Sequence, residues 1–109
     1  MSNNNQALNS KLPQLVKSIS EFHYDRNLID GANDHSQCVK LLEEAGELAA
    51  SILRGRDVSD DIGDIIVVLI NIAERNGLTL EQCLKVAYDE IKDRKGRMIN
   101  GSFVKETDL

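Results

Sequence analysis

The stretch LLEEAGELAASILRGRDVSDDIGDII, residues 41–66, combines two strongly apolar helical patterns with acidic residues spaced three apart. Glu44 and Glu47 form the first pair, and Asp61 and Asp64 form the second. On a helix, positions three apart project from neighbouring points one turn apart, so both members of a pair can reach one ion. The two segments therefore predict two helices that each present a pair of carboxylates.

The helices that carry these pairs have clear boundaries. Apolar residues recur at helical spacing over residues 35–54, and Gly55 predicts the end of that helix. Asp57 or Ser59 can cap the next helix, which we expect to end before Asn76-Gly77. The short connection favours antiparallel neighbours, which can bring the two acidic pairs face to face.

The run from Ile65 to Ile70 is apolar on nearly every side of its helix. A helix that is apolar all round is normally buried all round. A lone four-helix domain rarely covers one helix so fully, so we infer burial by a second subunit and expect a dimer or a pair of dimers.

The flanking sequence completes an all-α fold. A helical pattern over residues 11–25 and a second over 80–95, opened by a capping box at Thr79 and Gln82, predict a four-helix bundle. Asn100-Gly101 between short apolar pieces predicts a hairpin turn. We expect residues 1–10 to be a disordered segment, 11–97 the helical domain and 98–109 a hairpin and tail.

Composition sets limits on function. The chain has 109 residues, enough for one domain, and a net charge of -5, which argues against binding to duplex nucleic acid. No signal peptide or membrane-spanning run is evident, so a cytoplasmic protein without a membrane partner is expected. Cys38 and Cys83 are predicted to be buried reduced thiols, and His23 and His35 to be exposed or capping residues.

Four converging carboxylates would repel one another unless a cation lay between them. An all-oxygen set suits a hard ion, Mg²⁺ first and Mn²⁺ as a substitute. The alternative is a solvated acidic surface, with the first-turn acids serving the helix dipole. Asp64 argues against that alternative, because it lies beyond the first turn and directly precedes the most apolar run in the chain.

The segments KLLEEAGEL and DDIGDIIVVLINIA resemble the signature of the MazG-like nucleotide pyrophosphohydrolases, all-α enzymes. The resemblance extends from Lys40 to the end of the fourth helix and includes the glycine before each second carboxylate. Asp61 departs from the pattern, because the family usually has Glu there, and its side chain is shorter by one methylene.

The resemblance implies hydrolysis of a nucleoside triphosphate between the α and β phosphates, giving a monophosphate and pyrophosphate, with a role in cleaning the nucleotide pool. Mg²⁺ would be held by Glu44, Glu47, Asp61 and Asp64. Glu43 or Glu47 would take a proton from the attacking water.

Candidate substrate contacts lie on the later helices. Asn71 and Arg75 follow Asp64 at spacings that place all three on one side of the helix. Tyr88, Lys92 and Lys95 share an arc beside the apolar stripe of the last helix and form a basic face for phosphates. The alternative for the lysines is ordinary surface pairing with acids one turn away.

Two further functions remain open at this stage. Within the enzyme class, the substrate could be a related pyrophosphate such as phosphoribosyl-ATP. From another class, the chain could be a non-catalytic helical interaction module whose apolar third helix serves oligomerisation only.

Overall fold

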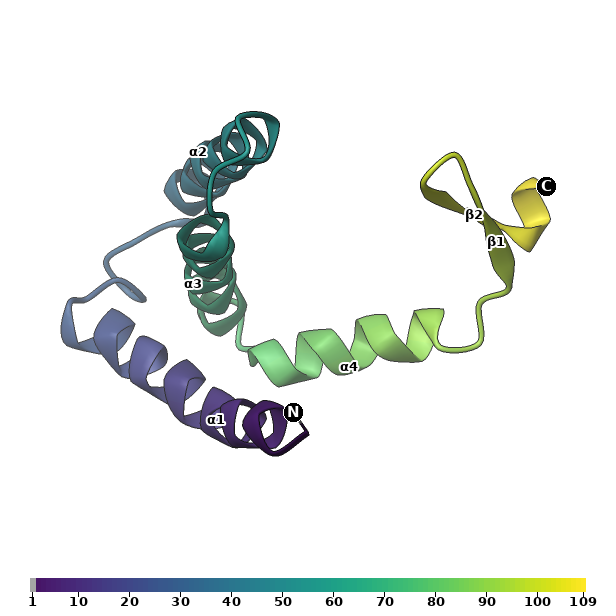
Figure 1. Ribbon diagram of the computed structural model, residues 1–109. Coiled ribbons are helices and arrows are strands. Elements are labelled where there is room, and N and C mark those ends of the chain that lie inside the picture. The colour runs from purple at the N-terminus through teal and green to yellow at the C-terminus, as the bar shows by residue number, and fades with distance from the viewer. Residues whose placement is uncertain (1) are drawn as a thin grey trace.

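The computed structural model describes residues 2–109, with side chains described from residue 11 onward. Four helices are followed by a small hairpin and a short 3-10 turn (Figure 1). The elements are α1 (Ser2–Asp25), α2 (Asp34–Leu53), α3 (Ser59–Arg75), α4 (Leu80–Ile91), β1 (Gly96–Ile99), β2 (Ser102–Lys105) and η1 (Glu106–Asp108). The predicted helical class and the C-terminal hairpin are confirmed.

α2 and α3 form an antiparallel helix pair, which is the most extensive packing between the described helices. Gly55 ends α2 with a φ of 66°, a left-handed value that glycine adopts without strain. Asp57 then accepts hydrogen bonds from the Ser59 amide at 2.9 Å and the Ser59 hydroxyl at 2.7 Å, which starts α3. At the other end, Asp34 at the start of α2 pairs with Arg75 at the end of α3.

The link between α1 and α2 is held against the end of α3. Arg75 donates Nε to the Ile29 carbonyl at 3.0 Å and Nη2 to the Ala32 carbonyl at 2.8 Å. Its third contact is the ion pair with Asp34. The guanidinium thus donates hydrogen bonds to backbone carbonyls of an irregular segment. Without it these carbonyls would need water as their hydrogen-bond partner.

α4 turns away from the other three helices and carries the hairpin at its end (Figure 1). Its start has the predicted capping box, with Thr79 and Gln82 each bonding the other's backbone amide. The helix ends at Ile91, four residues before the predicted end. In the hairpin turn, Asn100 and Gly101 both have positive φ, 51° and 83°, as a two-residue turn of the predicted kind requires.

The buried core of this single chain is small. Among the residues whose side chains are described, the buried apolar ones are Val68, Ile70 and Ala73, all on α3. Ile62 and Ile66 of the same helix are exposed. α3 is therefore covered on one side by α1 and α2 and uncovered on the other, and the four helices do not close around one core within the chain.

Several predictions about individual positions need correction. α1 begins at Ser2, not near residue 11, and the predicted disorder of residues 1–10 stays a prediction because their side chains lie outside the described residues. Cys38 is exposed and Cys83 half-buried, because their helix faces meet no partner within the chain. His23, predicted to be an exposed or capping residue, lies on α1 and is buried, with Glu74 of α3 near enough to act on its pKa.

Within residues 2–109, the structure contains no helix that is both long enough and apolar enough to cross a bilayer.

Candidate metal centre

The carboxylates of the acidic pairs come together at the interface of α2 and α3. Glu44, Glu47 and Asp64 each offer an oxygen within 4.8 Å of the other two. Asp61 belongs to a second group of the same size with Asp60 and Asp64. Asp64 belongs to both groups and so links all four predicted ligands. The four do not form one group in which every oxygen lies within 4.8 Å of the others.

Glu44 is the buried member of the cluster, with 6% of its surface exposed. Its Oε1 lies 3.2 Å from Nζ of Lys40, one turn earlier on α2. Its Oε2 is also buried and meets no hydrogen-bond donor among the described residues. A buried carboxylate oxygen without a donor is costly, so this atom indicates that the protein offers it to a partner of positive charge.

Repulsion between neighbouring carboxylates raises pKa values within the cluster. The Glu44 carboxylate raises the pKa of Glu47 above its ordinary 4.5, with burial and Asp61 acting in the same direction. Burial raises the pKa of Asp64 above 3.8, and the charges of Asp60 and Glu44 add to the effect. Without a cation, the folded chain therefore disfavours the fully ionised cluster.

Glu43 stands apart from this cluster. Its side chain is exposed, and its Oε2 lies 3.9 Å from Nζ of Lys40. It is absent from both groups of convergent carboxylates among residues 11–109. Of the two predicted proton acceptors, Glu47 is the one that the fold brings to the other acids.

Asn71 and Arg75, predicted to contact the substrate, instead contact the link between α1 and α2. Asn71 is almost fully buried, and its Nδ2 donates to the Leu28 carbonyl at 2.9 Å. Arg75 directs its guanidinium to two carbonyls of the link and to Asp34. These donors are thus engaged with the chain itself, and the predicted role of Asn71 and Arg75 at the substrate stays a prediction.

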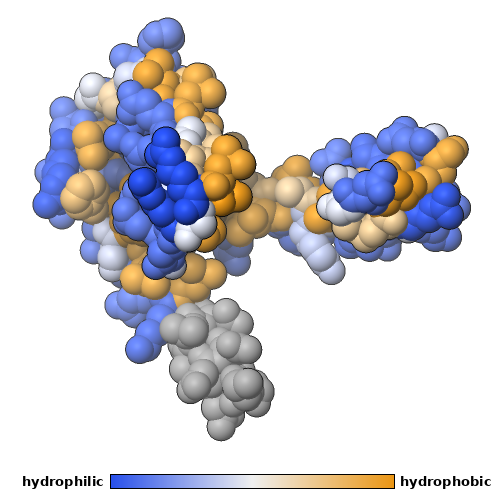
Figure 2. Space-filling model, turned by 45° about the horizontal axis from the view of Figure 1, so that its top comes forward, coloured by the Kyte–Doolittle hydropathy of each residue, from blue (hydrophilic) through white to orange (hydrophobic). Residues whose placement is uncertain are grey.

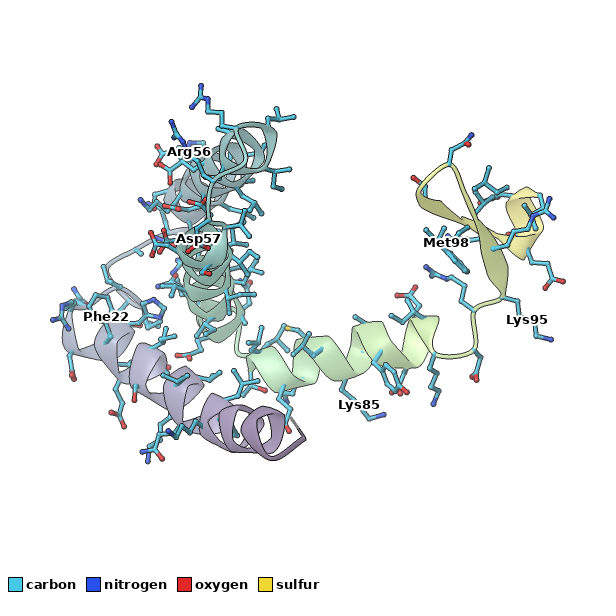
Figure 3. All side chains as sticks on the ribbon, in the orientation of Figure 1. Phe22, Arg56, Asp57, Lys85, Lys95 and Met98 are labelled. Carbon is cyan, nitrogen blue, oxygen red and sulfur yellow. The ribbon has the colours of Figure 1, made fainter. Side chains whose placement is uncertain are left out.

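The predicted basic residues of α4 lie away from the cluster within one chain. Tyr88 is exposed on α4, and Lys92 pairs with Asp89 at 3.5 Å, the surface pairing considered as the alternative. Lys95 follows α4 and lies beside the hairpin, whereas Asp57 marks the start of α3 on the other side of the molecule (Figure 3). The chain therefore separates the acidic site from the basic face expected to serve it.

Two features of this region were not predicted from the sequence. The first is the ion pair of Lys40 with Glu44, for which their i, i+4 spacing is a readable signal in the sequence. The second feature is a small polar group between α1 and α3. In it Ser20 donates to Glu74 at 2.9 Å, and burial lowers the pKa of His23 against the opposing charge of Glu74.

Comparison with known proteins shows similarity to a phage protein. Over 67 residues the chain is 37% identical to an uncharacterized 18.2 kDa protein from the rep-hol intergenic region of Haemophilus phage HP1. The match covers 60% of this chain and 41% of the phage protein, so the chain spans less than half the length of that relative. No protein-family model matches the chain, and no solved structure matches it.

Proposed function

We propose that this chain is a MazG-like, Mg²⁺-dependent nucleoside triphosphate pyrophosphohydrolase. It would cleave a ribo- or deoxyribonucleoside triphosphate between the α and β phosphates, to a monophosphate and pyrophosphate, and so clean the cytoplasmic nucleotide pool. The observation that carries the proposal is the buried Oε2 of Glu44, which meets no donor among the described residues and stands beside the oxygens of Glu47 and Asp64.

The donor set fits a hard divalent ion. Every convergent group is a carboxylate, and neither histidine nor cysteine belongs to the clusters found among the described residues. Oxygen-only sites favour Mg²⁺, with Mn²⁺ as a substitute, over zinc. When bound, Mg²⁺ would neutralise negative charge on the phosphates and make a coordinated water more acidic.

The carboxylates would have distinct roles. Glu44 is the buried ligand, Asp61 and Asp64 are half-buried, and Glu47 is exposed. Asp61, with its shorter side chain, would stand at the edge of the site. Glu47 is the favoured proton acceptor, because its carboxylate lies with those of Glu44 and Asp64, whereas Glu43 stands apart. Lys40 would be released from Glu44 when a cation enters and would then be free to face a phosphate.

Oligomerisation belongs to the same proposal. The uncovered side of α3, with Ile62 and Ile66 exposed, supports burial against another copy in a dimer or tetramer. A second copy would also complete the helical bundle that one chain leaves open.

The test is pyrophosphate release measured across the common ribo- and deoxyribonucleotides in the presence of Mg²⁺. Asp64→Asn should abolish release while helicity and oligomeric state remain, and Asp30→Asn in the exposed α1–α2 link is the matched control. Release from phosphoribosyl-ATP alone would assign the related activity instead. A folded wild-type protein that releases no pyrophosphate from any substrate would favour the non-catalytic module.

A further inference from the structure

The acids of α2 and α3 have one basic neighbour within their own helix pair. Among the ion pairs of residues 11–109, the one that reaches the convergent carboxylates joins Lys40 to Glu44. The other basic residues of this region lie elsewhere. Arg54 is exposed after the end of α2, and Arg75 pairs with Asp34 at the far end of α3. Lys40 is therefore the positive charge that the helix pair itself supplies to these acids.

Lys40 approaches Glu44 from the solvent. Its Nζ lies 3.2 Å from Oε1 of Glu44, and the Lys40 side chain is 53% exposed whereas that of Glu44 is 8% exposed. The same Nζ lies 3.9 Å from Oε2 of Glu43, which is also exposed. A lysine ammonium is strongly hydrated and stands on a long, flexible stem, so it can return to water from such a position.

The ammonium compensates Glu44 only in part. It meets Oε1, whereas Oε2 is buried and meets no donor among the described residues. Glu47 and Asp64 each offer an oxygen within 4.8 Å of one from Glu44, so a single positive charge faces three carboxylates. A doubly charged ion among these oxygens would neutralise them more fully, and it would repel an ammonium bound to the same carboxylate.

The convergent carboxylates are open to solvent on one side. Glu47 and Asp60 are exposed, and Asp61 and Asp64 are half-buried. Figure 2 looks toward the turn that joins α2 to α3 and shows hydrophilic surface over this end of the helix pair, with apolar surface beside it. An ion can therefore enter from water while the ammonium leaves to water.

A second lysine pair shows what is unusual at Lys40. Lys85 and Asp89 have the same i, i+4 spacing on α4, and Nζ of Lys85 lies 2.7 Å and 2.6 Å from the two Asp89 oxygens. Both oxygens are thus paired, and the Asp89 side chain is 42% exposed. Asp89 also belongs to neither group of convergent carboxylates found among the described residues. Lys85 is therefore the matched control for Lys40.

We propose that Lys40 is the resident counter-ion of these carboxylates and that a divalent ion fills the site by taking its place on Glu44. Filling the site is then an exchange of one cation for another, and Lys40 sets the ion concentration at which the exchange occurs. The inference rests on the proposed function for the ion, but it does not depend on hydrolysis of any substrate.

Calorimetric titration with Mg²⁺ in the absence of nucleotide tests the exchange. Lys40→Met should bind Mg²⁺ about tenfold more tightly than the wild type, because a competing unit charge close to a divalent ion has been removed. Lys40→Arg keeps the charge and should stay much closer to the wild type, and Lys85→Met should leave the affinity unchanged. Equal or weaker Mg²⁺ binding by Lys40→Met with unchanged helicity would overturn the proposal.

Amine labelling tests the exchange in the wild-type protein. An N-hydroxysuccinimide ester acylates free amines, so Lys40 should react several-fold faster once Mg²⁺ is added, while Lys85 keeps its rate in the same sample. Ionic strength is matched throughout, since salt alone weakens exposed ion pairs. If Mg²⁺ raises the melting temperature but leaves the labelling of Lys40 unchanged or slower, the ion and the ammonium bind together, and the proposal is wrong.

The exchange and the proposed function fail separately in these experiments. A wild type that frees Lys40 on binding Mg²⁺ but releases no pyrophosphate would refute the function and keep the exchange. An active wild type that shows neither faster labelling of Lys40 nor tighter Mg²⁺ binding in Lys40→Met would keep the function and refute the exchange. Absence of Mg²⁺ binding in both the wild type and Lys40→Met would refute both.

Discussion

Glu44 has one carboxylate oxygen paired with Lys40 and the other buried without a donor among the described residues, so we expect the proposed cation to contact it. Glu44→Gln should raise the Mg²⁺ concentration for half-maximal activity by one order of magnitude or more, because a buried ligand charge is lost. Glu43→Gln, at an exposed neighbouring position, is the matched control and should leave the titration nearly unchanged. Equal shifts for both variants would remove Glu44 from the ligand set.

The raised pKa values of Glu47 and Asp64 predict a pH dependence of the metal-free protein. Between the ordinary and the raised values the folded chain binds more protons than the unfolded chain, so the free energy of unfolding falls as pH rises through that window. The hydrogen bonds from Ser59 lower the pKa of Asp57, so Asp57 makes the free energy of unfolding rise with pH. The effect of Glu47 is therefore measured as the difference between the wild type and a Glu47 variant. Melting in a chelator from about pH 4 to about pH 7 should show a shallower decline for Glu47→Gln than for the wild type.

Added Mg²⁺ reverses this pattern. A cation neutralises the repulsion among ionised carboxylates, so the rise in melting temperature should be larger near neutral pH than near pH 4. An equal rise at both pH values would mean that the ion acts elsewhere than at this cluster.

At the scale of elements, Arg75 connects the end of α3 to the α1–α2 link and the start of α2. Arg75→Ala should lower the free energy of unfolding by about 2–4 kcal/mol, because it leaves two part-buried carbonyls and the Asp34 carboxylate without their donor. Arg54→Ala, at an exposed position after α2, is the control and should change stability by less than about 0.5 kcal/mol. If Arg75→Ala instead keeps full stability and raises KM, the residue serves the substrate and not the link.

The boundaries of α2 and α3 could be predicted because Gly55 and Asn76-Gly77 mark them in the sequence. The end of α4 at Ile91 could not be predicted, because three of the next four residues, Lys92, Arg94 and Lys95, are good helix formers and glycine appears only at Gly96. The convergence of Glu44, Glu47 and Asp64 followed from spacing and an antiparallel pair. The contacts of Arg75 and the burial of His23 could not be predicted from the sequence, since both depend on how α1 and the α1–α2 link pack against α3.

For the whole molecule, a folded chain with a core of three buried apolar side chains among the described residues should depend on association for its stability. The melting temperature should therefore rise by several degrees over a hundredfold increase in protein concentration. Sedimentation should give a species of at least twice 12.1 kDa. A monomer whose melting temperature is independent of concentration would contradict the predicted oligomer.

The antiparallel pair of α2 and α3 also sets an order of events during folding. Its two helices are joined by only a few residues, and short-range contacts of this kind form early because little chain entropy is lost in closing them. All four predicted ligands lie within this local unit. We therefore expect newly made chains to form the proposed ion site first, in a unimolecular step. Association with a second copy would follow in a slower step whose rate depends on protein concentration.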